Sequence, residues 1–151
     1  MHNYFSPMGS PIEAFAVYSR ILADLEARIL VEMEKPELAT KRMLRRLPAG
    51  MGFTFSYEFA RSSNLTVHSL DEFYSALKTI DVSSIRFHIE RGDFERWLSH
   101  VVGENKLADE MAKISETCKK LKEEVLRKKV LAVTERRIKQ LKGITNEDSP
   151  N

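Results

Sequence analysis

Residues 85–103, IRFHIERGDFERWLSHVVG, contain the signals that decide the fold expected for this chain. Gly92 suits the left-handed residue that ends a helix, because it has no Cβ. Asp93 comes next and is predicted to cap a second helix, since its carboxylate can accept from the N–H groups two and three residues on. Gly103 then ends this second helix. The sequence therefore predicts two short helices that meet at a sharp corner around residues 91–93.

Both helices of this corner have apolar side chains at helical spacing, which predicts that each helix buries one face. In the first helix, Ile85, His88 and Ile89 share a face. In the second helix, the apolar positions are Phe94, Trp97, Leu98, Val101 and Val102. Trp97 is the only tryptophan, and we expect it to be buried against the long helices of the chain.

The N-terminal part predicts a long helix that begins at Pro11. Ser10 and Glu13 form a capping box, and the missing N–H of the proline costs nothing at the first helical position. Nothing stops the helix before Lys35, which precedes a proline and so disfavours helical angles. About 25 residues correspond to roughly 37 Å of helix. Its apolar residues recur at steps of three or four, namely Phe15, Tyr18, Leu22, Leu25, Ile29 and Met33. Such a near-heptad stripe favours a long partner helix.

The next part predicts a shorter helix and one β-hairpin. The helix begins at Pro36 and reaches Leu47. A strand with an aromatic face follows, because aromatic and polar residues alternate at Phe53, Phe55, Tyr57 and Phe59. Residues 61–64 have turn chemistry, with Asn64 tolerant of positive φ, and residues 65–68 can return as the second strand. Two strands alone are marginal in water, so the aromatic face should lie against helices or another chain.

Capping residues predict two helices between the hairpin and the corner. Ser69 and Glu72 form a second capping box, which begins one helix. Asp81 and Ser83 offer caps for the helix that carries His88.

After the corner, one long helix is expected over residues 105–142. Its apolar stripe is Leu107, Met111, Ile114, Cys118, Leu121 and Val125. The apolar face then widens at residues 126–133, which a kink near residues 127–129 or a change of partner would explain. This wide face and the unpaired edges of a two-stranded hairpin favour contact with a second chain. The expected fold is mainly α (α+β): a helical domain with long N- and C-terminal helices and one small antiparallel β-hairpin.

Length and composition indicate a single globular domain over residues 1–151, with residues 1–9 and 145–151 as frayed tails. Cys118 is the only cysteine, so an intrachain disulfide is excluded, which fits a reducing compartment. The sequence has no apolar run near the roughly 20 residues that span a bilayer. Its N-terminus lacks the basic and apolar regions of a signal peptide. We therefore expect a cytoplasmic protein with no membrane partner.

His88, Glu90 and Asp93 are close in sequence and suggest acid–base or metal chemistry. However, a metal site needs three or four converging ligands, and the chain has no HxxxH, HExxH or CxxC pair. We expect instead a half-buried histidine that is hydrogen-bonded within the corner. Cys118 lies in an apolar stripe, which is typical of a small core residue. Residues 50–52 lack the third glycine and the Lys-Ser/Thr of a nucleotide-binding loop.

Catalytic, cofactor-binding and metal residues are therefore all expected to be absent, and the corner is interpreted as structural. Its residues are His88, Arg91, Gly92, Asp93 and Trp97.

Basic residues are concentrated in two segments. Residues 35–50 hold five basic residues and one acidic residue, and residues 119–142 hold ten basic and three acidic residues. Such arrays can neutralise phosphates, although charge runs are more often solvated faces. The candidate nucleic-acid contacts are Lys41, Arg42, Arg45, Arg46, Lys128, Lys129, Arg136 and Arg137. The first four lie at i, i+1, i+4 and i+5, which predicts one broad cationic face.

The run at residues 69–111, SLDEFYSALKTIDVSSIRFHIERGDFERWLSHVVGENKLADEM, resembles a family of archaeal and bacterial domains of unknown function. The pattern of that family is roughly SLxEFxxxLKxxDxxSIxFHxxRGDFxxWI, followed by a glycine and a Leu-Ala pair. With the aromatic hairpin, the resemblance covers residues 53–138, whereas residues 10–48 look like an N-terminal helical addition. Modules of this kind occur alone or appended to larger proteins, including glycosyltransferase-like ones, which implies an accessory role. The family supplies no catalytic residue to carry over.

Two functions follow from the sequence. The first is a non-enzymatic interaction or accessory module that forms homo-oligomers, or binds a protein partner, through its long helices. The alternative is a nucleic-acid-associated protein that binds phosphates through its basic helical faces. No cofactor is expected in either case.

Overall fold

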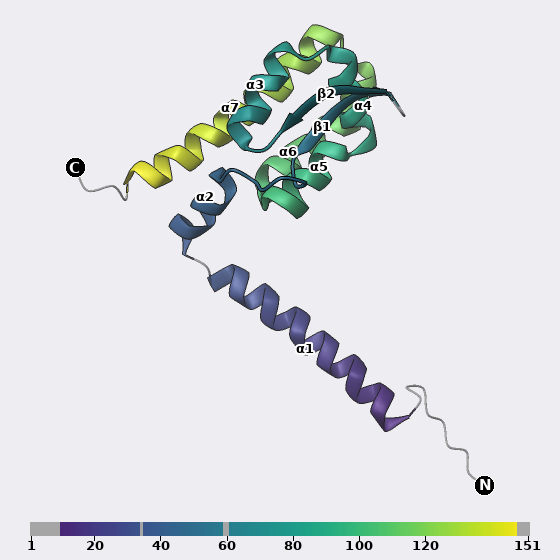
Figure 1. The fold of residues 1–151 in the computed structure, drawn as a ribbon, viewed down its shortest axis with the longest axis vertical. Helices are drawn as coiled ribbons and strands as arrows, with labels where there is room; N and C mark the ends of the chain where they lie inside the picture. Colours follow the sequence, from purple (N-terminus) through teal and green to yellow (C-terminus); the bar gives the residue numbers. More distant parts are fainter. Residues whose placement is uncertain (1–9, 34, 59–60, 148–151) are drawn as a thin grey trace. The chain divides into compact units, whose positions relative to one another are not determined.

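The computed structural model describes residues 10–33, 35–58 and 61–147 (Figure 1). The chain divides into two compact units, Met1–Lys35 and Pro36–Asn151. The boundary coincides with the junction before Pro36 that was predicted to end the first helix.

The first unit contains the long helix α1 (Pro11–Met33), which begins where the capping box predicted. The Ser10 N–H donates to Glu13 Oε2, and the Glu13 N–H donates to Ser10 Oγ, each at 3.2 Å. Five residues of the predicted apolar stripe are exposed: Phe15, Tyr18, Leu22, Leu25 and Ile29. The side chain of Met33 lies outside the part that the structure describes.

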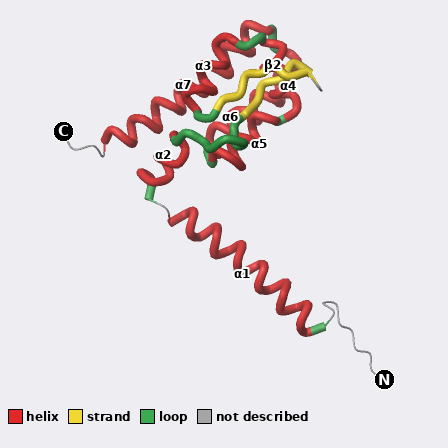
Figure 2. Tube along the Cα trace, viewed as in Figure 1, coloured by secondary structure: helices red, strands yellow, loops and turns green. Residues whose placement is uncertain are grey.

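The second unit is mainly helical with one β-hairpin, which confirms the expected fold class (Figure 2). Its elements are α2 (Pro36–Leu44), β1 (Phe53–Glu58), β2 (Arg61–Val67), α3 (Leu70–Thr79), α4 (Val82–Arg91), α5 (Asp93–Trp97), the π-helical turn η1 (Leu98–Val102), α6 (Asn105–Thr117), the 3-10 turn η2 (Cys118–Lys120) and α7 (Glu123–Glu147). Of the expected tail at residues 145–151, the first three residues therefore belong to α7, and the others lie outside the described residues. No helix in the described part of the chain is long and apolar enough to cross a membrane.

The hairpin packs its aromatic face into the core, as its alternation predicted. β1 and β2 are antiparallel, and Phe53 pairs with Val67. Phe53 and Phe55 are buried, whereas Tyr57 is half-buried. Phe59 of the predicted face lies outside the described residues.

The expected turn at residues 61–64 is wrong, because these residues lie within β2. The register shifts on both sides of the pair Ser56–Ser62, so the ladder is irregular there. Asn64 does have a positive φ, 63°, but it takes this conformation inside the irregular strand. The predicted turn residues therefore lie in an irregular part of β2, where residues that tolerate unusual backbone angles are also favoured.

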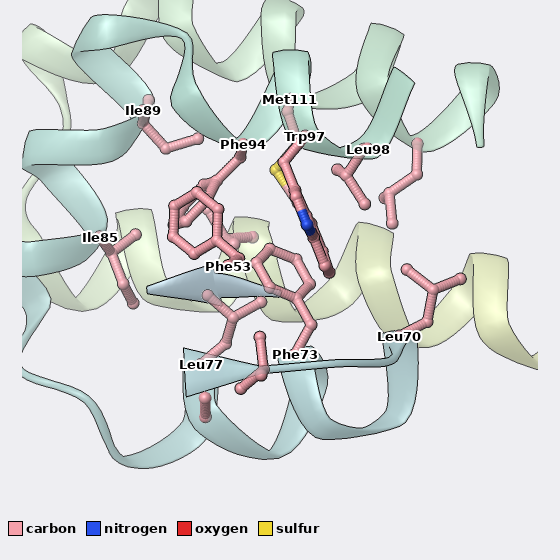
Figure 3. Packing of buried hydrophobic residues seen from close by; sticks show 14 of the residues in the cluster. Phe53, Leu70, Phe73, Leu77, Ile85, Ile89, Phe94, Trp97, Leu98 and Met111 are labelled. Atoms are coloured by element: carbon pink, nitrogen blue, oxygen red, sulfur yellow. The ribbon is translucent and has the colours of Figure 1, made fainter. Parts of the chain in front are cut away.

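Trp97 lies in an aromatic cluster beside the hairpin (Figure 3). Its ring centroid is 5.6 Å from that of Phe53 and 5.5 Å from that of Phe73. Its indole N–H donates to the Met51 carbonyl at 3.0 Å. The predicted burial of Trp97 is thus confirmed, with 6% of its surface exposed, but its aromatic neighbours come from β1 and α3 and not from the long helices that were expected.

Helix α2 begins at Pro36 as predicted but ends at Leu44, so its expected extension to Leu47 is wrong. The Leu47 N–H donates to the His68 carbonyl at 2.7 Å, and the Leu47 side chain is buried. The helix therefore ends before Leu47. Contact with the end of the hairpin gives the Leu47 N–H a hydrogen-bond partner and buries the Leu47 side chain.

The single helix expected over residues 105–142 is also wrong, because α6 and α7 are separated by η2 and by the extended residue Leu121. The two helices still pack against each other, and Glu110 at the middle of α6 lies 3.9 Å from Arg136 near the middle of α7. Arg86 of α4 donates to two carbonyls of the connection, those of Cys118 at 2.7 Å and Leu121 at 2.8 Å. The break therefore precedes the expected kink at residues 127–129.

The wide apolar face of α7 is covered by its own unit. Leu126 and Val130 are fully buried, while Leu131 and Val133 pack against the core partly buried. Helix α7 contacts α2, α3, α4 and α6, and it lies alongside α3 in Figure 1. The inference that this face needs a second chain is therefore wrong, since a helix with several neighbours needs a wide apolar face.

Gly92 is the left-handed residue that the sequence predicted, with φ of 73°. We expect Gly92→Val to lower the free energy of unfolding by roughly 1–2 kcal/mol or more, because a Cβ is penalised in this conformation. Urea denaturation followed by circular dichroism measures the change. Gly143→Ala is the matched control, because Gly143 lies inside α7 with open space around its Cα, so alanine there should stabilise by about 0.5–1 kcal/mol. A Gly92 variant as stable as the parent would contradict the corner.

Candidate functional site

The α4–α5 corner brings His88 and Asp93 together. Gly92 is the residue before α5, and it has no side chain to cap that helix. Asp93 is the first residue of α5, so its predicted role as the cap is wrong. Its carboxylate instead accepts from His88 Nδ1 at 2.8 Å, from Arg91 Nε at 3.0 Å and from an Arg96 guanidinium nitrogen. Three nearby donors thus replace the backbone N–H groups as its partners.

His88 is held from both sides, which fixes its tautomer. The Ser56 N–H of β1 donates to His88 Nε2 at 2.8 Å, so Nε2 has no proton. Nδ1 therefore has the proton and donates it to Asp93. Only 4% of the His88 surface is exposed, so the histidine is buried rather than half-buried as expected. A ring with both nitrogens bonded to the protein has no free lone pair for a substrate proton.

The protonation states of this pair follow from burial and hydrogen bonds. Burial lowers the pKa of His88 below 6.5, although the hydrogen bond and charge of Asp93 oppose this shift. Burial raises the pKa of Asp93, but the hydrogen bonds from His88 and Arg91 outweigh it and hold this pKa below 3.8. At neutral pH the corner therefore contains a neutral histidine and an ionised aspartate.

An open cavity of about 400 Å³ lies against the corner. Its lining includes His88, Asp93, Arg96, Trp97 and His100. Hydrogen bonds within the protein already occupy four of these side chains. Within residues 10–33, 35–58 and 61–147, no three His, Cys, Asp or Glu side chains are grouped to hold a metal ion.

The structure does not place the four basic residues at 41–46 on one helical face, because α2 ends at Leu44. Arg45 donates to the carbonyls of Val101 at 3.3 Å and Val102 at 3.4 Å. Arg46 forms a surface ion pair with Glu72. Arg42 is half-buried, and Lys41 is exposed.

The four basic candidates of α7 also differ in their surroundings. Lys128 and Lys129 are exposed, whereas Arg136 lies 3.9 Å from Glu110. Arg137 forms an ion pair with Glu104, whose side chain is completely buried; only 13% of the Arg137 side chain is exposed. Arg137 therefore serves the core, since its guanidinium group neutralises a buried carboxylate.

Three arginines form clamps at the carboxyl ends of helical segments, and we call them the arginine clamps: Arg45, Arg86 and Arg127. Arg127 donates to the carbonyls of Leu77 and Ile80 at 2.7 Å each, at the end of α3. Arg86 donates to the carbonyls of Cys118, the C-cap of α6, and of Leu121, the C-cap of η2. Arg45 donates to the carbonyls of Val101 and Val102 at the end of η1. Unpaired carbonyls at a helix end attract cationic donors. Much of the arginine charge is therefore used inside the fold.

Sequence reasoning missed the buried Glu104 and the role of Ser84. The Ser84 hydroxyl donates to the Ser56 carbonyl at 2.6 Å, so Ser84 and His88 together bind the outer edge of β1. A signal was present in their spacing, because a serine four residues before a histidine lies on the same helical face. By contrast, nothing in the sequence around Glu104, which directly follows Gly103, indicates that it pairs with Arg137, 33 residues later.

The chain matches one protein family. The profile of a family described as "Family of unknown function (DUF5752)" covers residues 16–135. This match begins within α1, and so it extends further towards the N-terminus than the resemblance at residues 53–138. Neither the curated proteins nor the solved structures contain a match to the chain.

Proposed function

Since this chain belongs to the family of unknown function DUF5752, which supplies no activity, we propose from its own residues that it is a non-enzymatic interaction module that forms homo-oligomers through α1. The exposed apolar stripe of α1 carries this proposal. The occupied ring nitrogens of His88 support the non-enzymatic part, because the histidine of the candidate acid–base cluster is bound to Ser56 and Asp93.

A helix with the composition of α1 needs a partner for its apolar face. Isolated helices are marginal in water, and most helical stability in proteins comes from burying an amphipathic face. The stripe holds large side chains, from Phe15 near its start to Ile29 near its end, and their exposed fractions are 73% and 52%. The family profile includes most of this helix, so α1 is part of the module that the family shares.

The spacing of the stripe favours a second copy of α1 as the partner. From Phe15 to Ile29 the steps alternate between three and four residues, which is the 3.5-residue repeat of a coiled coil. Two identical helices present matching stripes, and a two-fold symmetric pair buries the same surface on both chains. The wide face of α7 is already covered, so α1 is the long helix available for this contact. The single, buried Cys118 fits a reducing compartment, and we propose a cytoplasmic location.

Light scattering after size exclusion tests the proposal. At micromolar concentration we expect the parent to elute as a dimer or larger species. Leu22→Glu/Leu25→Glu should elute as a monomer, because two carboxylates at core positions of a helix pair are costly to bury. The matched control, Ala23→Glu/Ala27→Glu, adds the same charge to exposed positions beside the stripe and should keep the oligomer.

A monomeric parent at micromolar concentration would contradict association through α1. Titration with duplex DNA is the second arm. Salt-sensitive binding at physiological ionic strength that is lost in Lys128→Ala/Lys129→Ala would favour the nucleic-acid function instead.

A further inference from the structure

We propose that His88 is a proton-operated latch that holds the outer hairpin segment, residues 56–58 and 61–63, against α4, and that protonation of His88 releases this segment while the core stays folded. The proposal is independent of association through α1, because every contact that carries it lies within the second unit.

The latch consists of two bonds between α4 and the outer edge of β1. His88 Nε2 accepts from the Ser56 N–H at 2.8 Å, and the Ser84 hydroxyl donates to the Ser56 carbonyl at 2.6 Å. The N–H and the carbonyl of Ser56 would be unpaired at the edge of the two-stranded sheet. Side chains of α4 form hydrogen bonds with both of them.

Protonation of His88 removes the acceptor of one of these two hydrogen bonds, the bond from the Ser56 N–H. A proton on Nε2 would turn the acceptor of the Ser56 N–H into a donor, and two donors cannot share one hydrogen bond. Asp93 holds the opposite nitrogen, Nδ1, so the ring cannot flip to present another acceptor without breaking that bond as well. The imidazolium form would therefore push the Ser56 N–H away while it keeps its contact with Asp93.

The packing of the hairpin limits the release to its outer part. Phe53 and Phe55 are buried in the aromatic cluster and anchor the inner part of β1. Beyond them, Glu58, Arg61 and Ser62 are exposed, and the register is irregular on both sides of Ser56. A segment with exposed backbone and few buried side chains has a low local free energy of opening.

The groups around His88 determine the direction in which its pKa is shifted, and so the pH range over which its stabilising contribution is lost. Asp93 favours the imidazolium form, and Arg91 opposes it. Arg96 pairs with Asp93, and His100 shares the neighbouring cavity. From β1, the rings of Phe53 and Phe55 contact the imidazole. Burial outweighs Asp93 and lowers the folded-state pKa of His88 below 6.5. The stabilising contribution of neutral His88 is therefore complete above pH 6.5 and is lost as the pH falls from there towards the folded-state pKa.

Nuclear magnetic resonance of the full chain tests the latch. The side-chain ¹⁵N shifts of His88 should show the Nδ1–H tautomer at pH 7 and a titration below pH 6.5. The amide protection factor of Ser56 should fall about tenfold across the same titration, which corresponds to the loss of about one hydrogen bond. The buried amides of Leu77 and Ile85 should keep their protection over this range.

Two variants separate the latch from a general effect of acid. His88→Gln keeps an acceptor but cannot titrate, so the pH response of Ser56 should disappear. His100→Gln removes an exposed histidine beside the same cavity and should leave the response unchanged. If His88→Gln does not fold, the parent still decides the question. Constant Ser56 protection through the His88 titration would overturn the proposal, and so would a simultaneous loss of protection at Ser56, Leu77 and Ile85.

Discussion

Trp97→Ala should lower the free energy of unfolding by about 3–5 kcal/mol, which is the usual cost of deleting a large aromatic side chain from a core. The indole ring contacts the rings of Phe53 and Phe73, so its removal leaves a cavity between the hairpin and α3. It also leaves the Met51 carbonyl without its indole donor. Urea denaturation followed by circular dichroism measures the loss, since the variant has no tryptophan fluorescence.

Trp97→Phe is the matched comparison, because it keeps most of the aromatic volume and removes the indole N–H. We expect this variant to lose clearly less stability than Trp97→Ala. A loss below about 1 kcal/mol for the alanine variant would mean that the aromatic cluster does not support the fold, since core deletions of this size cost several times more.

Glu104→Gln should also destabilise strongly, by about 3–5 kcal/mol, because it removes one partner of a buried ion pair. Glu104 has two tasks. One of its carboxylate oxygens pairs with Arg137, and the other accepts from the Lys106 N–H at 3.2 Å at the start of α6. Glutamine can keep the second contact, so the variant isolates the effect of leaving the Arg137 charge unpaired.

A double variant distinguishes the ion pair from the shape of the site. Glu104→Gln/Arg137→Met removes both charges, and we expect it to recover part of the lost stability, because no unpaired charge remains buried. Glu110→Gln is the surface control. Glu110 pairs with Lys113 at 3.7 Å and Arg136 at 3.9 Å on the exposed side of α6, so its loss should cost less than about 1 kcal/mol. Equal effects at Glu104 and Glu110 would rule out a special role for the buried pair.

The features that local sequence signals control could be predicted. The capping residues Ser10, Ser69 and Asp81 each begin a helix, and Gly92 takes the left-handed conformation. These signals act over a few residues, so they do not depend on the rest of the fold.

Features that depend on distant partners could not be predicted. Asp93 has the residue type and position of a cap, but the donors of the corner attract its carboxylate more strongly than the backbone does. The break between α6 and α7 falls at residues 118–122, where the sequence has neither glycine nor proline and the apolar stripe continues. Two carbonyl bonds from Arg86, which lies on another helix, stabilise the turn there.

The same limit applies to the candidate site. The sequence identified His88 as bonded within the corner, but it could not show that Ser56, 32 residues away, supplies the second bond. Likewise, the count of basic residues at 119–142 did not distinguish solvated lysines from Arg127 and Arg137, which have partners inside the fold. The number of basic residues follows from the composition, but whether each side chain can bind a phosphate depends on how it packs in the fold.

The arginine clamps imply an uneven tolerance to sequence divergence. Each of these side chains reaches two or more carbonyl oxygens through a planar guanidinium group, as Arg86 and Arg127 show most clearly. A lysine would keep the positive charge but could not span two oxygens with the same fixed geometry. Exchange of arginine for lysine should therefore be neutral at the solvated positions of this module and costly at the arginine clamps. Distant members of the family should vary freely at the solvated positions and keep arginine at the clamps.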